Sequence, residues 1–291
     1  MQLTPLAAHG ACALLFLADL LARALRIRWY LAGLGRRISL FDAFQLNAWG
    51  DAAAGLTPMR FGGELAKFAG LARCRVPAPV AVAALSLEAT ITYPLVALFG
   101  GGLAMRFAPD WWQEARPAVE TALNSRWPAV AVVGALLLTL GLGMWWWRRR
   151  GPGASAPGQS RAALKSFPLW PVLAGIPLSL FNVVARTLML PLLAMTLPAH
   201  PPFGVMAVGS FVLLYSQLVL PTPAGVGAVE LGFLSGMAGD LGDASTPLLI
   251  AWRLYTVGAG ALLGVVLAVA TFGFRPIIAA VARVVGRSRP A

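Results

Sequence analysis

GLTPMRFGGELAKFAGL, which runs from Gly55 to Leu71, is the stretch of this sequence that decides the fold. Pro58 has no backbone N–H and its ring clashes with the preceding helical turn, while Gly62 and Gly63 are poor helix formers. We therefore expect one helix to end before this run and another to begin within it. The run predicts two short helices joined by a bend.

The rest of the chain has the composition of a membrane protein. Of its 291 residues, 58% are hydrophobic and 12% charged, and the mean hydropathy is +0.74, which is far from the composition of a soluble globular domain. Several windows of about 20 residues carry few or no charges, the length that an α-helix needs to cross the hydrocarbon core. Five full spans are expected: Leu3–Leu25, Val76–Met105, Trp127–Trp147, Leu169–Leu197 and Pro247–Phe274.

The net charge of +12 comes mostly from arginines in short loops beside these spans. Loops rich in Lys and Arg stay in the cytoplasm, so these charges orient the chain and do not indicate nucleic-acid binding. The expected cytoplasmic charges are Arg23, Arg26, Arg28, Arg36, Arg37, Arg148, Arg149, Arg150, Arg161, Lys165, Arg275, Arg283, Arg287 and Arg289. The N-terminus is then expected outside and the C-terminus in the cytoplasm.

The segment from Ser39 to Arg75 must enter and leave the membrane on one side, because cytoplasmic arginines flank both of its ends. At about 1.5 Å per residue its two arms are roughly 24 and 15 Å long, shorter than a hydrocarbon core of about 30 Å. We therefore predict a re-entrant helical hairpin. Its broken backbone is tolerable at membrane depth only where it faces protein or a wet cavity.

A second run, VLPTPAGVGAVELGFLSGM from Val219 to Met237, repeats the first. Thr222-Pro223 aligns with Thr57-Pro58, and Glu230-Leu231 aligns with Glu64-Leu65 with one extra residue between. The predicted hairpin tips comprise Thr57, Pro58, Gly62, Gly63, Thr222, Pro223, Gly225 and Gly227. Loops expected outside flank the second hairpin, so it should enter from the opposite side.

The predicted fold is an all-α integral membrane protein with inverted-topology repeats. It has about five full transmembrane helices plus two re-entrant helical hairpins from opposite sides, a plan that recurs in secondary transporters. The expected divisions are a first repeat plus linking span at 1–147, a flexible cytoplasmic loop at 148–168, a second inverted repeat at 169–274 and a basic cytoplasmic tail at 275–291.

Charged residues within the predicted membrane segments are the candidate site. Each costs roughly 2.5–3.5 kcal/mol at the centre of a span, so such residues should face a cavity or one another. The candidate substrate-binding residues are Arg60, Glu64, Lys67, Arg186, Glu230 and Arg253. Guanidinium groups and the positive helix N-termini expected at the tips would favour a phosphate. The alternative for these residues is a structural ion-pair role, which is the expectation for Asp19 with Arg23.

Spacing adds two expectations about these residues. Arg60, Glu64 and Lys67 recur at intervals of four and three, which would put them on one face of the returning helix. Arg186 and Arg253 belong to spans of the second repeat, and together with Arg60 they could form a single cationic site.

The two repeated runs resemble the flippase-like domain of the lysylphosphatidylglycerol synthase transmembrane family. The resemblance rests on LTPMRFGGELAKFAGL and LPTPAGVGAVE, with support from RALRIRW after the first span. It implies functional positions at Pro58, Arg60, Gly63, Glu64, Pro223, Gly225, Gly227 and Glu230, and Arg253 is similar to an arginine of the family's last spans. Glu88 departs from the family's pattern, since Ala-Thr-Ile-Thr follows it, so it receives no role.

The resemblance implies a free-standing membrane portion in the bacterial cytoplasmic (inner) membrane, because family members that aminoacylate a lipid carry a soluble catalytic domain that we do not expect here. The leading hypothesis is an ATP-independent flippase for an anionic lipid or for a polyprenyl-phosphate-linked or glycolipid amphiphile, since the sequence has no phosphate-binding GxxxxGK[ST] loop. Glu64 or Glu230 would couple transport to protons. The lipid, the direction of transport and the oligomeric state are left open.

Two alternatives to a flippase stay open. One is a noncatalytic partner of a lipid-modifying enzyme. The other is an intramembrane enzyme acting on a lipid phosphate, which would need a nucleophile and a base within hydrogen-bond reach. The sequence has no HExxH or GxSxG motif, and His9 and His200 lie near span ends. We therefore expect no enzyme, no catalytic residues, no cofactor and no metal site.

Overall fold

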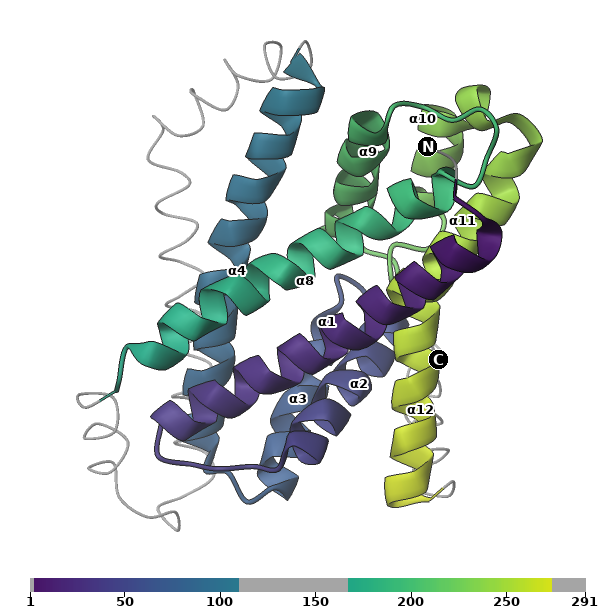
Figure 1. Ribbon diagram of the computed structural model, residues 1–291. Helices are drawn as coiled ribbons and strands as arrows, with labels where there is room; N and C mark the ends of the chain where they lie inside the picture. Colours follow the sequence, from purple (N-terminus) through teal and green to yellow (C-terminus); the bar gives the residue numbers. More distant parts are fainter. Residues whose placement is uncertain (1–2, 110–166, 274–291) are drawn as a thin grey trace, which may run out of the picture.

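The computed structural model describes residues 3–109 and 167–273, and these ranges form an all-α fold (Figure 1). The expected span Trp127–Trp147, nearly all of the loop 148–168 and the tail 275–291 lie outside the described residues. In chain order the elements are α1 (Pro5–Gly33), α2 (Leu40–Leu56), α3 (Phe61–Arg73), α4 (Ala78–Phe107), α8 (Trp170–Ala194), α9 (Phe203–Ser216), α10 (Ala228–Leu241), the 3₁₀ turn η1 (Gly242–Ala244), α11 (Ser245–Arg253), the π-helical turn η2 (Leu254–Gly258) and α12 (Ala259–Phe272).

Four helical stretches are long and apolar enough to cross a membrane. They are α1, α4, α8 and the run Gly242–Phe272, and they coincide with four of the five expected spans. The chain is therefore a multi-pass membrane protein. The first span is longer than expected, because the helix that Thr4 caps continues past Leu25 to Gly33. It ends where Gly35 turns the chain with a φ of +74°.

The predicted break at Pro58 is confirmed and separates α2 from α3. Ser39 begins α2 by accepting a 2.9 Å hydrogen bond from the Asp42 backbone N–H. Thr57 ends the helix in an extended conformation, as expected for a residue before proline. Its hydroxyl donates to the Ala53 carbonyl at 2.9 Å and accepts the Gly62 N–H at 2.8 Å. One threonine side chain thus links the end of α2 to the start of α3.

Glycines let the two arms of this first hairpin pack closely. A Cβ on Gly62 would lie 2.7 Å from the Ala53 carbonyl oxygen, and a Cβ on Gly63 would lie 3.1 Å from the Gly50 carbonyl oxygen. A Cβ at Gly62 would clash with backbone, and a Cβ at Gly63 would be tighter than an ordinary van der Waals contact. The predicted glycines of the first tip are therefore packing positions between α2 and α3.

The second hairpin, formed by α9 and α10, has a tip with the same backbone geometry as the first. After each Thr-Pro pair come two residues in the left-handed region: Met59 and Arg60 at φ of +51° and +60°, and Ala224 and Gly225 at +49° and +69°. The turn hydrogen bonds also correspond. In the first tip, the Arg60 N–H donates to the Thr57 carbonyl at 3.3 Å and the Phe61 N–H to the Pro58 carbonyl at 3.2 Å. In the second tip, the Gly225 N–H donates to the Thr222 carbonyl at 3.1 Å and the Val226 N–H to the Pro223 carbonyl at 2.9 Å. The Thr-Pro alignment made from the sequence therefore holds in three dimensions.

The two tips touch. Pro58 and Pro223 form an isolated antiparallel bridge, and the Met59 N–H donates to the Leu220 carbonyl at 3.2 Å. In Figure 1 the α2–α3 hairpin opens toward the bottom of the fold and the α9–α10 hairpin toward the top, so their tips meet between the two ends. Within the described residues, the hairpins therefore approach each other from opposite directions.

Two apolar clusters divide the fold, and α1 contributes to both. Its first half, from Cys12 to Leu20, packs with α8, α9, α10 and α11. Its second half, from Ala24 to Leu34, packs with α2, α3 and α4. Each cluster covers one hairpin. The middle of α1 lies at the boundary between them, and there the buried side chains are charged.

The last span packs on α2 through small residues. A Cβ on Gly264 of α12 would lie 2.0 Å from the Ala48 carbonyl oxygen, and one on Gly260 would lie 2.9 Å from Asp51 Oδ2. Small residues at this spacing allow helices to approach closely inside a membrane, where packing drives their association. The close approach brings α12 against the carboxylate of Asp51.

We predict that Gly264→Ala lowers the thermal stability of the detergent-solubilised protein. The added methyl meets backbone that cannot rotate away, and such overpacking costs about 1–3 kcal/mol. The matched control is Gly10→Ala in α1, where a Cβ meets nothing within 4 Å, so alanine should be neutral or stabilising in that helix. Equal thermal midpoints for the two variants would contradict the close α2–α12 packing.

Candidate functional site

Asp51 on α2 lies at the centre of a buried ion-pair network. Arg23 of α1 donates to both of its carboxylate oxygens, at 3.0 and 2.7 Å. Arg186 of α8 and Arg60 of the first tip lie 3.7 and 3.9 Å from its Oδ1. One carboxylate thus joins a full span of each half to the first hairpin.

Asp19 on α1 is the second acidic member of this network. Its Oδ2 lies 3.2 Å from Arg23 Nε and 3.1 Å from Arg186 Nε, and its Oδ1 accepts a hydrogen bond from the Asn182 amide. Asp19 is 1% exposed. A buried carboxylate is tolerable only where it is paired and hydrogen-bonded, as it is here. The expected pairing of Asp19 with Arg23 is confirmed.

Glu88 on α4 forms a second buried group. It accepts hydrogen bonds from Arg26 of α1 and, at 3.1 Å, from Lys67 of α3. Lys67 also lies 3.1 Å from Glu64, whose side chain is 57% exposed. Arg26 makes a further hydrogen bond to the Ser179 hydroxyl of α8 at 2.8 Å. This group ties α1, α3, α4 and α8 together.

Arg253 fastens the second tip to the last span. Its Nε lies 2.8 Å from Glu230 Oε1, and its Nη2 donates to the Ala224 carbonyl at 3.0 Å. Glu230 accepts the Gly227 N–H at 2.7 Å, the acidic half of a capping box at the start of α10. The π-helical turn η2 begins directly after Arg253, and such turns are frequent at functional sites.

Arg60 is the most weakly paired cation of the Asp51 network. Its side chain is 18% exposed, and its approach to Asp51 is 3.9 Å, the longest of the carboxylate's contacts. Among the described residues, its side chain is hydrogen-bonded to the side chain of the neutral Gln217, at 3.1 Å from Nη1 to Oε1. Arg60 therefore retains donor capacity where the two tips meet.

Three more donors at the second tip are buried and have no partner among the described residues. They are the Gln217 side-chain amide nitrogen, the Thr222 hydroxyl and Arg253 Nη1. Gln217 accepts from Arg60, and Arg253 donates to Ala224, two residues after Thr222. Buried donors without partners are costly, so these groups are suited to donate hydrogen bonds to the oxygens of an anion.

The charges of the described ion pairs do not balance. The Asp51 network holds Arg23, Arg60 and Arg186 against two carboxylates, whereas the Glu88 group and the Arg253–Glu230 pair hold equal numbers of both signs. One positive charge is therefore left over, in the network that contains Arg60. A bound anion would neutralise it.

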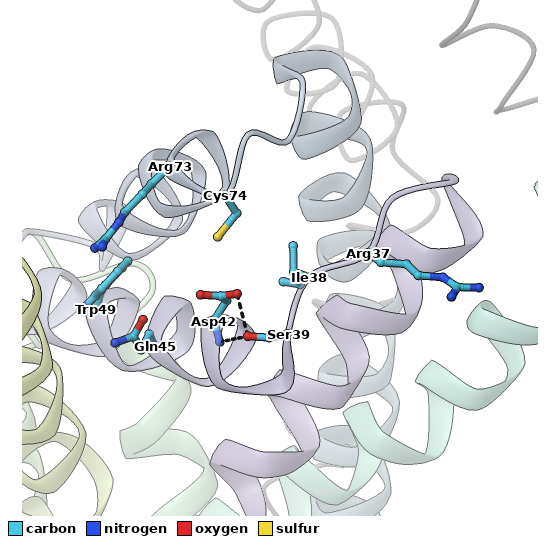
Figure 2. Close-up of a pocket in the computed structure, with 8 residues that line it drawn as sticks. All are labelled: Arg37, Ile38, Ser39, Asp42, Gln45, Trp49, Arg73 and Cys74. Carbon is cyan, nitrogen blue, oxygen red and sulfur yellow. Dashed lines mark hydrogen bonds between the residues drawn. The ribbon is translucent and has the colours of Figure 1, made fainter.

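A cavity of about 220 Å³ lies elsewhere, at the open end of the first hairpin. Figure 2 shows the residues that line it: Arg37, Ile38, Ser39, Asp42, Gln45, Trp49, Arg73 and Cys74. None of them belongs to the ion-pair networks described above. This cavity is thus distinct from the meeting point of the tips.

Comparison with known proteins places these features in a family. Over residues 3–264 the sequence matches the family described as the lysylphosphatidylglycerol synthase TM region. The chain belongs to this family. Membership indicates a membrane domain involved in lipid handling, and it confirms the family suspected from the hairpin motifs. Comparisons with curated proteins and with solved structures gave no match.

The family positions of the two hairpin motifs have separate structural roles here. Pro58 and Pro223 form the contact between the tips, while Gly225 takes a left-handed conformation at φ of +69° and Gly227 takes one at +87°. Gly63 permits helix packing, as described above. Arg60 and Glu230 carry the charges nearest the tips. The family motif therefore builds a junction.

The expectation that three charges share one face of α3 is wrong for Arg60. Glu64 and Lys67 do pair on α3, but Arg60 precedes the helix in a left-handed conformation and contacts Gln217 and Asp51 instead. The three arginines expected to form a single cationic site have different carboxylate partners, since Arg186 shares Asp51 with Arg60 whereas Arg253 pairs with Glu230. Arg186 and Arg253 both lie close enough to Arg60 for their charges to repel its own.

The N-terminal amides of α3 do not project freely, contrary to the anion site expected there. Residues 60 to 63 donate their N–H groups to acceptors within the tip, including the Thr57 carbonyl and hydroxyl. Only the helix dipole remains available to an anion at this end. Side chains must therefore supply the hydrogen bonds.

Arg23 and Arg26 were expected in a cytoplasmic loop and are instead buried within α1, at 7% and 2% exposure. Their pairing with Asp51 and Glu88 explains this, since desolvated guanidinium groups need carboxylate partners. A signal was present in the sequence: Asp19, Arg23 and Arg26 follow intervals of four and three, the spacing of one helical face. Glu88, which received no role, is the hub of the second group.

We predict that Asp51→Asn strongly destabilises the protein. Removing this charge leaves three guanidinium groups with Asp19 alone, and breaking a buried ion pair costs about 3–5 kcal/mol. Thermal unfolding in detergent measures the effect, with Asp42→Asn, outside the networks, as the matched control. A thermal midpoint for Asp51→Asn equal to that of the control would show that the network does not hold the fold together.

Proposed function

We propose that this protein moves an anionic lipid across the cytoplasmic membrane without ATP, with the headgroup bound where the two hairpin tips meet. The observation that carries the proposal is the junction itself. The tips are bridged at Pro58 and Pro223, and around this bridge lie Arg60 and the unpartnered donors of Gln217, Thr222 and Arg253. Membership in a lipid-handling family supports a lipid as the ligand.

Inverted repeats with two re-entrant hairpins are part of this proposal. The order α1, α2–α3, α4 parallels the order α8, α9–α10, α11–α12. The bridge joins equivalent residues of the two units, which is the contact expected beside a two-fold axis. Transporters built in this way bind substrate near the midplane, at the interface of their repeats. The hairpins would then reach the midplane from opposite leaflets.

The chemistry of the junction fits a phosphate. Guanidinium groups bind phosphate oxygens through charge-assisted hydrogen bonds, and amide and hydroxyl donors complete such a site. The surplus positive charge of the Asp51 network would be neutralised by the phosphate. The acyl chains would stay in the surrounding lipid, so only the headgroup would need a polar path. Among the arginines of the Asp51 network, Arg60 has the longest contact with this carboxylate, so moving its side chain toward a headgroup would cost the least free energy.

A carrier accounts for these features better than an enzyme does. An enzyme acting on a lipid phosphate would need a nucleophile beside a base. His9 contacts Tyr255 at 3.1 Å, and His200 contacts the Pro201 carbonyl at 2.8 Å, so their described partners are not residues of the junction. A noncatalytic partner of a lipid-modifying enzyme would have no need for unpaired donors at its centre.

We predict that Arg60→Ala slows lipid movement roughly 10- to 100-fold in liposomes, because a hydrogen bond to a charged group contributes about 1.5–3 kcal/mol. The assay follows acyl-chain-labelled phosphatidylglycerol by dithionite quenching. Arg253→Ala should also impair transport, but this variant removes the ion-pair partner of Glu230 as well, so its effect does not report on the headgroup site alone. Arg28→Ala, which removes an exposed arginine of α1, is the matched control.

Each outcome of this assay assigns a function. Equal rates for Arg60→Ala and Arg28→Ala, with both proteins normally assembled, would reject the junction as the transport site. Chemical conversion of labelled lipid by the purified protein would indicate an enzyme. Absence of movement with every variant and with the parent protein would favour the noncatalytic partner.

We further predict that proton coupling, if it operates, depends on Glu230 or Glu64. Glu230 pairs with Arg253 at the second tip, and Glu64 pairs with Lys67 while more than half exposed. Glutamine cannot take up a proton, so Glu230→Gln or Glu64→Gln should abolish any acceleration by an imposed pH gradient while leaving movement without a gradient. Unchanged acceleration in the double variant would remove both residues from the coupling.

A further inference from the structure

Two helices end in the same way on one side of the fold. At the end of α1 the chain turns through Gly35, and the Arg36 N–H donates to the Leu31 carbonyl at 2.8 Å. At the end of α3 it turns through Arg75, and the Val76 N–H donates to the Leu71 carbonyl at 3.0 Å. Both ends are Schellman caps. In such a cap the turning residue takes a left-handed conformation.

Arg75, the turning residue in the cap of α3, has a left-handed backbone conformation that residues other than glycine disfavour. Its φ is +59°, where glycine is comfortable and a residue with a Cβ is strained. The equivalent residue of α1 is a glycine. An arginine at this position therefore has no advantage for the backbone, and strained residues tend to lie at binding or switching sites. The reason for Arg75 should be found in its side chain.

A cavity of about 580 Å³ opens between these two helix ends. Its lining consists of Ala32, Gly35, Arg36, Arg37, Cys74, Arg75 and Val76. Three arginines and no acidic residue line it, and none of the three forms an ion pair within the described parts of the chain. All three are exposed. The cavity thus presents uncompensated positive charge.

The neighbouring cavity of Figure 2 differs in its charge. It shares Arg37 and Cys74, but Asp42 also lines it. In Figure 2 the Arg37 guanidinium points away from Asp42 and Arg73. The guanidinium carbon of Arg73 lies 5.9 Å from the ring centroid of Trp49 and 4.9 Å from that of Phe272. The arginine-lined cavity is therefore the one suited to an anion.

We propose that this cavity binds the phosphate headgroup of an anionic phospholipid in the leaflet at which α1 and α3 end. Charge complementarity supports a phosphate, because basic pockets beside membrane spans bind anionic headgroups. The position supports a lipid. Leu40 and Phe41, which follow the loop after α1, are 36% and 62% exposed. Near the end of α1, the ring of Trp29 packs against that of Trp170, with 6.1 Å between the ring centroids. Exposed apolar residues and paired tryptophans are typical of the membrane interface.

This lipid site goes beyond the proposed transport site and does not depend on it. None of its residues belongs to the Asp51 or Glu88 groups or to the tips. The positive-inside pattern puts it in the cytoplasmic leaflet. A lipid held there would fix the ends of α1 and α3, the helices that carry Arg23 and Lys67.

Cys74 provides a reporter for this cavity and for the neighbouring cavity of Figure 2, because it lines both. The chain has two cysteines, and Cys12 is fully buried whereas Cys74 is partly exposed and lines the cavity. In a Cys12→Ala background, Cys74 would be the single thiol available to N-ethylmaleimide, an uncharged reagent. A lipid headgroup in the cavity should then slow its alkylation.

The test compares alkylation rates in vesicles of phosphatidylcholine alone and of phosphatidylcholine containing phosphatidylglycerol. We expect the rate to fall at least about fivefold with phosphatidylglycerol. Arg75→Gly should reduce this protection by about fivefold, the change expected for the roughly 1 kcal/mol that one arginine contributes near an anionic surface. Glycine suits the left-handed backbone, so loss of protection in Arg75→Gly would not reflect misfolding.

Three controls make the result specific. Arg28→Gln removes an exposed arginine of α1 that does not line the cavity and should keep full protection. Arg60→Ala should also keep it, which separates this proposal from the transport site. Inorganic phosphate added to phosphatidylcholine vesicles should give no protection, whereas protection by phosphate would overturn the lipid assignment in favour of a soluble anion.

The lipid site would be rejected if Arg75→Gly and Arg37→Gln showed the same ratio of rates between the two vesicle types as the parent protein. Equal rates for the parent in both vesicle types would reject it as well. Native mass spectra give an independent readout, since the Arg75→Gly protein should retain one phosphatidylglycerol fewer than the Arg28→Gln protein. Equal numbers of retained lipids would contradict the proposal.

Discussion

The contact between the two hairpin tips gives partners to backbone groups that the helix breaks leave open. Each break frees backbone N–H and C=O groups, and inside a membrane these groups must find partners within the protein. The Thr-Pro turns satisfy most of them locally, and the pairing of Pro58 with Pro223 and of Met59 with Leu220 joins the two turns. Each hairpin therefore completes the environment of the other, and charged side chains of both halves meet around Asp51 beside this contact.

The buried charges follow from the same meeting of halves. The middle of α1 separates two apolar clusters, and its Asp19, Arg23 and Arg26 find partners on α2, α4 and α8. Most guanidinium groups in this interior have a carboxylate at hydrogen-bond distance, which offsets their desolvation. Arg60 is an exception, since its described carboxylate contact, with Asp51, is 3.9 Å long. The least compensated cation thus lies at the junction of the tips, where the proposed headgroup would bind.

The two proposed sites differ in how far acidic residues neutralise their arginines. In the interior the acidic residues nearly balance the arginines, so that a single positive charge remains for a ligand. At the ends of α1 and α3 three exposed arginines have no acidic partner among the described residues. The first arrangement suits a headgroup that must leave again, since little charge holds it. The second suits a lipid that stays in its leaflet.

The sequence by itself determined the helical class, the four long apolar helices of the described residues and the two helical hairpins, because these depend on local properties: apolar length, the missing N–H of Pro58 and Pro223, and the spacing of Glu64 and Lys67. It could not determine which charges pair across the fold. Arg23 and Arg26 looked like loop charges because α1 continues beyond the apolar window, and Glu88 had no local partner. Their positions depend on contacts between α1, α2, α4 and α8. Arg60 likewise does not lie on the face of α3 that its spacing predicted. It precedes the helix in a left-handed conformation, and its side chain contacts Gln217 of the second hairpin. Pairing of buried charges is a long-range property, and only the tertiary structure decided it.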